Sequence, residues 1–237
     1  MHALDNVIWK ALTTRQAEFA ESFGIACRFV PEVSPLAAFE ERSREGYESL
    51  ARLVGLGGTL RLFLGTPYEA QVGWTLLNAS AMPEMVYEGT ELRPADSRGQ
   101  LSPHEANADI VELGLADSVE MMELTKLTRP GPFGKRTHEL GTYFGIRREG
   151  KLVAMAGERL KIPGYTEVSA VCTHPEHTGR GYARMLTMEV MRRILDRGET
   201  PFLHVREGNV RAIQLYNQLG FATRALLYTV GLRKDAA

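Results

Sequence analysis

The 237-residue sequence lacks most of the features that mark secreted, membrane-spanning or nucleic-acid-binding proteins. Its only cysteines, Cys27 and Cys172, are far apart, so neither a disulfide framework nor a thiolate metal site is expected. No apolar run is long enough to cross a membrane, and the first residues do not form a signal peptide. A formal net charge of -1 gives no overall field that would attract nucleic acid or anionic lipid.

The composition that remains is typical of a soluble globular protein. Hydrophobic residues make up 44% of the chain and charged residues 24%, which is enough apolar material for a sizeable core. The length suits one large domain or two small ones. We therefore expect a cytoplasmic protein without a metal, a nucleic-acid partner or a membrane contact, present as a monomer or a homodimer.

Composition divides the chain into three segments: residues 1–92, a polar linker at 93–108, and residues 109–237. The first segment begins with a predicted helix over 6–24, on which Val7, Leu12, Phe19 and Phe23 could share an apolar face. A short helix ending at glycine follows. Three successive strands are then predicted, at 59–65, 71–78 and 84–89. These patterns indicate a small N-terminal α/β unit.

The third segment reads as a mixed sheet with helices, so the fold class is α/β (α+β). An amphipathic helix over 116–127 is expected to direct Val119, Met122 and Leu127 toward a core. The other predicted elements are strands at 110–114, 143–148, 151–160, 165–174, 201–205 and 222–233, and helices at 181–197 and 209–220.

The stretch "HTGRGYARML" places two glycines and two arginines between a strand and a long helix. The first amides of a helix have no intrahelical partners, and glycines let such amides converge on an anion. Arg180 and Arg184 add positive charge. A phosphate site and a plain turn that binds nothing are both consistent with these residues. No P-loop sequence is present, and Arg184 stands where a dinucleotide fingerprint needs its third glycine.

The same stretch, followed by "PFLHV" and then "NVRAIQLYNQLGF", resembles the GCN5-related N-acetyltransferase (GNAT) superfamily, in particular its FR47-like branch. The family signature, Arg/Gln-x-x-Gly-x-Gly/Ala, aligns with residues 178–183, and Thr178 departs from it at the first position. The resemblance covers about residues 109–237. It implies a GNAT fold there, and residues 1–92 could then be a degenerate copy of that fold.

What the resemblance implies is binding of acetyl-coenzyme A (acetyl-CoA) as co-substrate. The strands at 165–174 and 201–205 would separate along part of their length, with the thioester between them. The first strand would pair with the pantetheine arm, and the glycine turn would hold the pyrophosphate. The residues placed at the cofactor are Val171, Cys172, Thr173, Thr178, Gly179, Arg180, Gly181, Tyr182, Ala183, Arg184, Asn209 and Ala212. Asn209 is equally well explained as a helix N-cap, and Cys172 as a small buried side chain.

Two residues match the family's catalytic positions. Tyr216 would protonate the leaving thiolate, and the alternative is that it is an ordinary core tyrosine. Glu167 would act as base; strict strand alternation would place it on the same face as Val171, and the alternative is a solvent-facing glutamate. Glu158 is a weaker candidate for the base.

The sequence thus predicts an N-acetyltransferase that moves an acetyl group to a primary amine: a small molecule, a peptide end or a lysine. The segment 128–141 lies where this superfamily often builds its acceptor pocket, with Phe133, Arg136 and His138 as candidate lining residues or a surface loop. Two other classes remain open. One is a non-catalytic module that senses acyl-CoA, and the other is a nucleotide-binding oxidoreductase.

Overall fold

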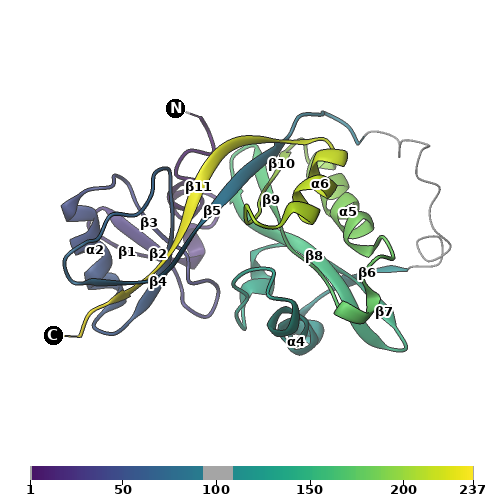
Figure 1. The fold of residues 1–237 in the computed structure, drawn as a ribbon, viewed down its shortest axis with the longest axis horizontal. Helices are drawn as coiled ribbons and strands as arrows, with labels where there is room; N and C mark the ends of the chain where they lie inside the picture. The colour runs from purple at the N-terminus through teal and green to yellow at the C-terminus, as the bar shows by residue number, and fades with distance from the viewer. Residues whose placement is uncertain (1, 93–108, 237) are drawn as a thin grey trace.

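The computed structural model describes residues 2–92 and 109–236, so the predicted linker at 93–108 lies outside it. Within those residues an eight-stranded sheet, in the order β4-β11-β5-β10-β9-β8-β7-β6, extends along the molecule (Figure 1). A three-stranded sheet, β1-β2-β3, lies at the end nearer β4. The strands are β1 (Ala20–Phe23), β2 (Ala26–Phe29), β3 (Ala37–Phe39), β4 (Thr59–Leu64), β5 (Trp74–Tyr87), β6 (Ile110–Leu113), β7 (Tyr143–Arg148), β8 (Lys151–Ile162), β9 (Tyr165–Thr173), β10 (Thr200–His204) and β11 (Phe221–Lys234).

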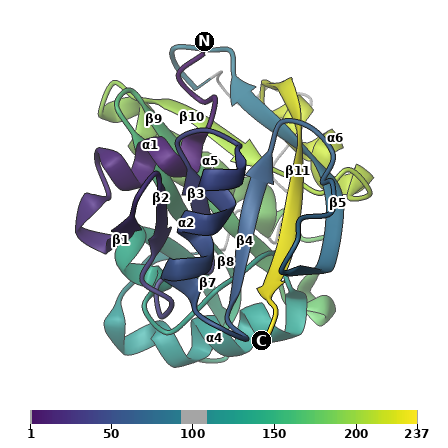
Figure 2. The same ribbon diagram turned by 90° about the vertical axis from the view of Figure 1, so that its left-hand side faces the viewer.

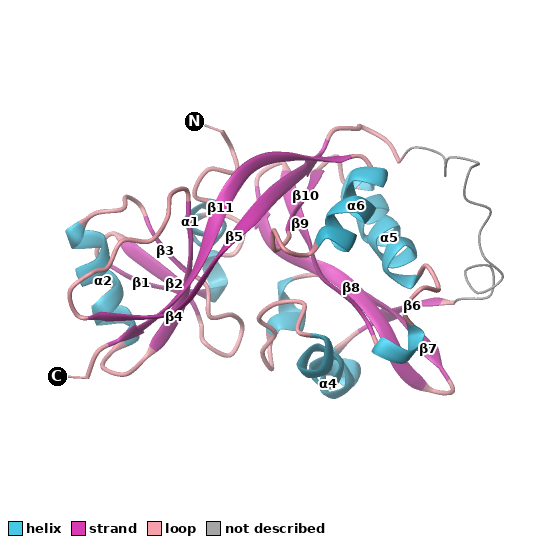
Figure 3. Cartoon of the chain, in the orientation of Figure 1, coloured by secondary structure: helices cyan, strands magenta, loops and turns pink. Residues whose placement is uncertain are grey.

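Helices cover both faces of the large sheet and enclose separate apolar clusters (Figure 3). The α-helices are α1 (Val7–Thr13), α2 (Arg44–Val54), α4 (Ser118–Thr128), α5 (Tyr182–Asp196) and α6 (Val210–Gln218). Helices α5 and α6 pack on one face, while α1 and α4 lie against the other. The mixed α/β architecture matches the expected fold class.

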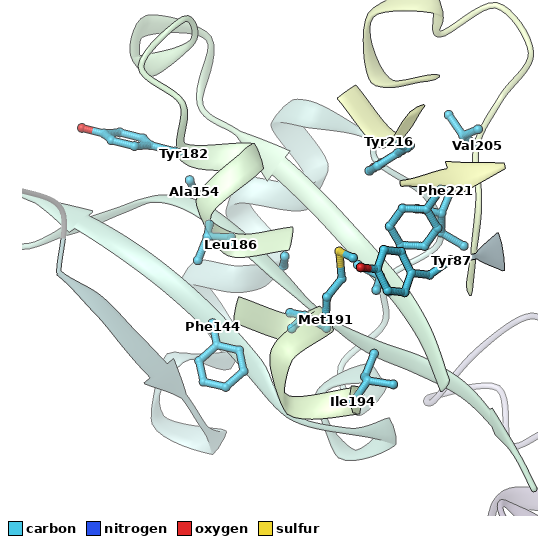
Figure 4. Packing of buried hydrophobic residues seen from close by; sticks show 14 of the residues in the cluster. Tyr87, Phe144, Ala154, Tyr182, Leu186, Met191, Ile194, Val205, Tyr216 and Phe221 are labelled. Atoms are coloured by element: carbon cyan, nitrogen blue, oxygen red, sulfur yellow. The ribbon is translucent and has the colours of Figure 1, made fainter. Parts of the chain in front are cut away.

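Helix α5 shows how the sequence builds the main core. Its apolar side chains recur at helical spacing, and Leu186, Val190 and Ile194 are fully buried. Figure 4 shows Leu186 and Ile194 within this cluster. Gly181 begins the helix and Gly198 follows its end, both at positive φ, where a side chain would be strained. The predicted helix at 181–197 is therefore confirmed almost to the residue.

Strand β9 contains a bulge that changes which side chains face the same way. Ala170 has φ 53°, and the register with β8 passes from Met155↔Cys172 to Gly157↔Ser169, so β9 holds one extra residue there. The bulge reverses the simple alternation beyond it. The expectation that Glu167 and Val171 share a face is therefore wrong.

Strands β9 and β10 part in the middle of the sheet. Their parallel pairing runs from Thr200↔Tyr165 to Phe202↔Glu167 and continues no further in the described register. Beyond that point β10 pairs only with β5. The separation of these two strands, which the family resemblance implied, is confirmed.

The predicted N-terminal helix over 6–24 is wrong beyond Thr13. The hydroxyls of Thr13 and Thr14 bond back to carbonyls in the preceding turn, where α1 ends. Phe19 then lies in a single 3-10 turn, and residues 20–23 pair with β2, leaving Phe23 about half exposed. Sheet pairing in the folded protein overrides the helical period of this stretch.

Two further elements differ from their predictions. The strands expected at 71–78 and 84–89 are one 14-residue strand, β5, because β11 pairs with it along its whole length. Helix α4 buries Met121 and Leu124, whereas Val119 and Leu127 are exposed, so the predicted core face is wrong at those two positions. Sequence periodicity in α4 was too weak to select the correct face.

The first and third segments share one sheet. Strand β5, from residues 1–92, lies between β11 and β10, and β4 pairs with the far edge of β11 (Figure 2). The division at 93–108 thus separates the chain in sequence but not in the sheet. The assignment of the GNAT unit to residues 109–237 stays a prediction, and the degenerate-copy interpretation of residues 1–92 is not confirmed.

Candidate active site

A cavity of about 890 Å³ opens where β9 and β10 part. One wall is formed by β9 from Val168 to Thr173, together with α6 and the end of β10. The opposite wall comes from β4, β5 and β11, and the segment after α4 closes one side. Residues 1–92 therefore build part of the cavity, which the sequence did not indicate.

The β9 wall offers backbone groups to a ligand. Past Glu167 this strand pairs with β8 on one edge, and no described strand pairs with its other edge. The Thr173 hydroxyl, on the same wall, is buried and has no hydrogen-bond partner in the described structure. An open strand edge beside an orphaned donor fits a chain that carries amides, such as pantetheine. Val171 and Cys172 also line this wall.

The glycine turn has the backbone that an anion site requires. Gly179 and Gly181 both have φ 78°, and a Cβ added at Gly179 would meet no atom within 4 Å. No side chain caps the first turn of α5, so its leading amides are free of side-chain partners. Arg180 and Arg184 form no ion pair with any residue in 2–92 or 109–236. These features suit a pyrophosphate.

Two predicted cofactor residues in this turn have their side chains engaged elsewhere. The Thr178 hydroxyl donates to the Pro175 carbonyl at 3.0 Å, inside the turn. The Tyr182 side chain is buried (Figure 4). Its hydroxyl accepts a hydrogen bond from Arg148 at 3.0 Å. Only the backbone of Tyr182, like that of Ala183, is available to a phosphate at the start of the helix.

Helix α6 contributes Asn209 and Tyr216 to the cavity. The Asn209 side chain accepts from the Ala212 amide at 3.3 Å, so its predicted role as N-cap is confirmed. Ala212 itself is partly buried against the core below α6.

Tyr216 both packs in the core and reaches the cavity. Its ring meets Phe221 edge to face at 6.0 Å between centroids, and no described residue bonds to its hydroxyl. Burial, with a smaller contribution from nearby Cys172, raises the pKa of Tyr216 to about 12. The phenol therefore keeps its proton at neutral pH and can donate it. The two interpretations of this residue are compatible.

Glu167 lies behind the cavity wall in a buried ion pair. Its carboxylate accepts two hydrogen bonds from Arg159, at 2.6 and 2.8 Å, and contacts His204 Nδ1 at 2.6 Å. Burial alone would raise its pKa, but the charges of Arg159 and His204 outweigh that and lower the pKa to about 2. A carboxylate held this way has little affinity for a proton, so the geometry does not favour it as a base.

Glu158, the weaker candidate, is also engaged. Its buried carboxylate pairs with Lys161 at 2.8 Å and with Arg197 at 2.7 Å. Neither Glu167 nor Glu158 lines the cavity. The described cavity lining contains no aspartate or glutamate at all.

His204 links a row of charges across five strands. Its buried ring contacts Glu167 on one side and Glu84 on the other, at 2.6 and 3.3 Å. Arg159 pairs with the outer side of Glu167, and Arg224 with the outer side of Glu84. The signal for this row in the sequence is the presence of ionisable residues within largely apolar strands: Glu84, Glu167 and His204.

Apart from His204, the charged side chains that line the described cavity are all arginines. Arg61 of β4 lines it together with Arg129, Arg159 and Arg206. Of the residues expected in the acceptor segment, only Phe133 lines the cavity; Arg136 pairs with Glu139 at the surface, and His138 does not face the cavity. Arg61 was missed because the N-terminal segment was not expected to reach the site.

Comparisons with known proteins agree with this geometry. A model of the FR47-like protein family matches residues 143–230. A crystal structure from Novosphingobium aromaticivorans, assigned to the GNAT family of acetyltransferases, is 34% identical with a TM-score of 0.86 and covers 100% of both chains. A GCN5-related N-acetyltransferase from Kribbella flavida shares the fold, with a TM-score of 0.63 and 15% identity over 98% of this chain and 97% of that one.

A curated relative matches over a shorter stretch. N-alpha-acetyltransferase RimI of Mycobacterium tuberculosis is 38% identical over 97 residues, which are 39% of this chain and 55% of that protein. The chain thus spans about half the length of this relative.

Fold and site together define an acyltransferase with parted central strands and a glycine turn before its main helix. The full-length 34% identity makes the assignment specific: the chain belongs to the GNAT family of acetyltransferases, and its resemblance to FR47-like proteins is confirmed. Among residues 2–92 and 109–236, no helix is long and apolar enough to cross a membrane, and no three His, Cys, Asp or Glu side chains gather as a metal site.

Proposed function

We propose that the protein transfers an acetyl group from acetyl-CoA to a primary amine inside the cavity between β9 and β10. The observation that carries this proposal is the Tyr216 hydroxyl, which lines the cavity beside the open edge of β9 and has no described partner. Acetyl-CoA supplies a thioester carbonyl that an amine can attack. The glycine turn would hold its pyrophosphate and the β9 edge its pantetheine arm.

In the transfer, the amine nitrogen forms a bond to the acetyl carbon and the carbon–sulfur bond breaks. The leaving thiolate then takes a proton. Tyr216 donates it in this proposal, which is supported by a phenol that stays protonated and a hydroxyl that is not committed to another group. The acylated nitrogen loses its extra proton to water, and a solvent proton restores the phenol.

The ammonium proton of the acceptor must be lost before attack. Since no carboxylate lines the described cavity, water is the simplest proton acceptor. The arginines of the wall assist, because a positive charge nearby lowers the pKa of an ammonium group. An α-amine, with a pKa near ~8, then reacts more readily than a lysine, whose pKa is near ~10.4. The name of the RimI relative refers to N-alpha-acetylation, which supports the same choice.

Thiol release from acetyl-CoA with a panel of α-amines and matched ε-amines tests the proposal. We expect release with at least one α-amine, and a fall in kcat of ~10²-fold in Tyr216→Phe, with unchanged acetyl-CoA affinity. Tyr165→Phe, at the far end of β9, is the matched control.

The other outcomes separate the competing classes. Tight acetyl-CoA binding without thiol release from any amine would favour the acyl-CoA sensor. Stabilisation by NAD, but not by acetyl-CoA, would favour the oxidoreductase. Full activity in Tyr216→Phe would leave the transferase intact and return Tyr216 to a packing role.

A further inference from the structure

Arg61 occupies an unusual position on the wall opposite the cofactor strand. It extends from β4, is partly buried, and donates to Thr229 Oγ1 and to Asn78 Oδ1, each at 3.0 Å. A guanidinium has five N–H donors in a planar fork. The remaining donors of Arg61 have no partner within residues 2–92 and 109–236.

Other positive charges surround it without neutralising it. Burial lowers the pKa of Arg61, and the charges of Arg206 and Arg159 lower it further, so the three groups lie within electrostatic reach of one another. Arg159 is neutralised by its two hydrogen bonds to Glu167. Arg61 and Arg206 have no acidic partner in the part of the chain that the structure describes.

The partial burial of Arg61 costs free energy unless a ligand supplies the missing negative charge. A partly desolvated guanidinium without a counter-ion is unfavourable, and its planar fork matches the two oxygens of a carboxylate or a phosphate. The hydrogen bonds to Thr229 and Asn78 hold the guanidinium in place before any ligand arrives. A ligand that carried only a positive charge would be repelled by the same wall.

We propose that the acceptor is an amine that also carries an anionic group, a carboxylate or a phosphate, and that Arg61 binds this group while the amine faces the thioester. The proposal rests on the proposed acetyl transfer and names the class of its acceptor. Amino acids, peptides with a nearby acidic side chain and phosphorylated amines all belong to this class. Simple alkylamines and lysine-rich peptides do not.

Matched acceptors on the wild-type protein give the first test. An alanyl dipeptide with a free carboxylate is compared with its C-terminal amide, and an aminoalkyl phosphate with the corresponding amino alcohol. We expect kcat/KM to be at least about tenfold higher for the anionic member of a pair, mainly through KM. Preference for the carboxylate pair, or for the phosphate pair, identifies the anion. Equal values within both pairs would overturn the proposal.

Substitution of Arg61 gives the second test. In Arg61→Gln we expect KM for the anionic acceptor to rise about ten- to a hundredfold, while the neutral acceptor and the affinity for acetyl-CoA change little. Arg61→Lys should recover part of the loss. Arg233→Gln, on the neighbouring strand and outside the cavity, is the control and should behave as wild type. An equal effect of Arg61→Gln on both acceptors would contradict the proposal.

A binding measurement keeps the two proposals separate. The wild-type protein saturated with CoA is titrated calorimetrically with an N-acetyl dipeptide, its amide, and an N-acetylaminoalkyl phosphate. Stronger binding of a charged ligand, reduced in Arg61→Gln, supports the anion site even if no amine in the panel is acetylated. Binding of the neutral amide as tightly as both anions would refute it, whatever the outcome of the transfer assay.

Discussion

Gly181 is the residue whose backbone most directly connects sequence to cofactor binding. With φ 78° it begins α5 in a conformation that side chains rarely adopt, and its lack of a Cβ keeps the start of the helix open. We expect Gly181→Val to weaken acetyl-CoA binding by ~10²-fold or more, since strain moves the amides and the side chain blocks the phosphate.

The control for this prediction is Gly164→Val. Gly164 has φ 79° in the turn between β8 and β9, and an added Cβ there would meet no atom within 4 Å. The Gly164→Val substitution therefore introduces similar backbone strain at a position away from the cofactor. Calorimetric titration with acetyl-CoA measures both variants. Equal affinities for wild type and folded Gly181→Val would reject the phosphate interpretation of the turn.

Residue-level prediction from the sequence succeeded where the local chain determines the result. The Asn209 cap and the glycine turn depend on neighbours a few residues away, and both are present. The placement of Glu167 failed because it assumed an unbroken strand, and the bulge at Ala170 is not visible in the spacing of apolar residues. The sequence could not identify Arg61 as a cavity residue, because its position depends on the pairing of β4 with β11. Its hydrogen-bond partner on that strand, Thr229, is 168 positions away.

At the scale of elements, the charged row centred on His204 ties the central strands together. Glu167 and Glu84 face the imidazole, and Arg159 and Arg224 lie beyond them. Burial would lower the pKa of His204, but the two carboxylates outweigh it, so the pKa is raised above its usual 6.5. The protonated ring therefore stabilises the packing of β9, β10 and β5.

This row predicts how stability depends on pH. Because the pKa of Glu167 falls from 4.5 to about 2, its contribution is complete above pH 4.5 and is lost as pH falls toward 2. Because the pKa of His204 is raised, its contribution is complete below pH 6.5 and is lost as pH rises through the folded value. These two groups therefore contribute together between about pH 4.5 and 6.5.

The His204→Gln variant tests the part of this pH dependence that comes from His204, the loss of stability as pH rises. The amide keeps two polar contacts but cannot be charged, so the variant should lose stability most at mildly acidic pH and approach wild type as pH rises. Urea midpoints measured from pH 4 to pH 9 on both proteins give the comparison. A constant difference across that range would mean that folding leaves the pKa of His204 unshifted, and would contradict this prediction.

Prediction of elements was best for local pairs and poorest for long-range ones. The hairpin of β7 and β8 and the helices α2, α5 and α6 follow from periodicity and from their flanking glycines or caps. The split of β5 arose because its partner, β11, is distant in the sequence. The excess helix after Thr13 arose because pairing with the adjacent strand β2 overrides the helical period of residues 20–23. The charged row likewise spans residues 84 to 224.

At the scale of the whole molecule, the sheet makes the N-terminal segment part of the acetyltransferase. Removing residues 1–92 would take away β5 from between β11 and β10, and β4 from the other edge of β11. Long strand edges and the apolar side chains packed against them would then meet water. The wall that carries Arg61 would be lost as well.

We expect a chain beginning near residue 93 to aggregate, and to bind acetyl-CoA weakly if it is kept soluble. The glycine turn and the β9 edge both lie in the retained part, so some affinity should persist, whereas acceptor binding should not. Melting curves of full-length and truncated protein, with and without acetyl-CoA, measure this. Ligand at about 100 times its dissociation constant adds ~2.7 kcal/mol of stability, which is enough to detect. Equal melting temperatures would mean that the segments fold independently despite the shared sheet. A folded truncation without any shift would mean that β4 and β5 also build the cofactor site.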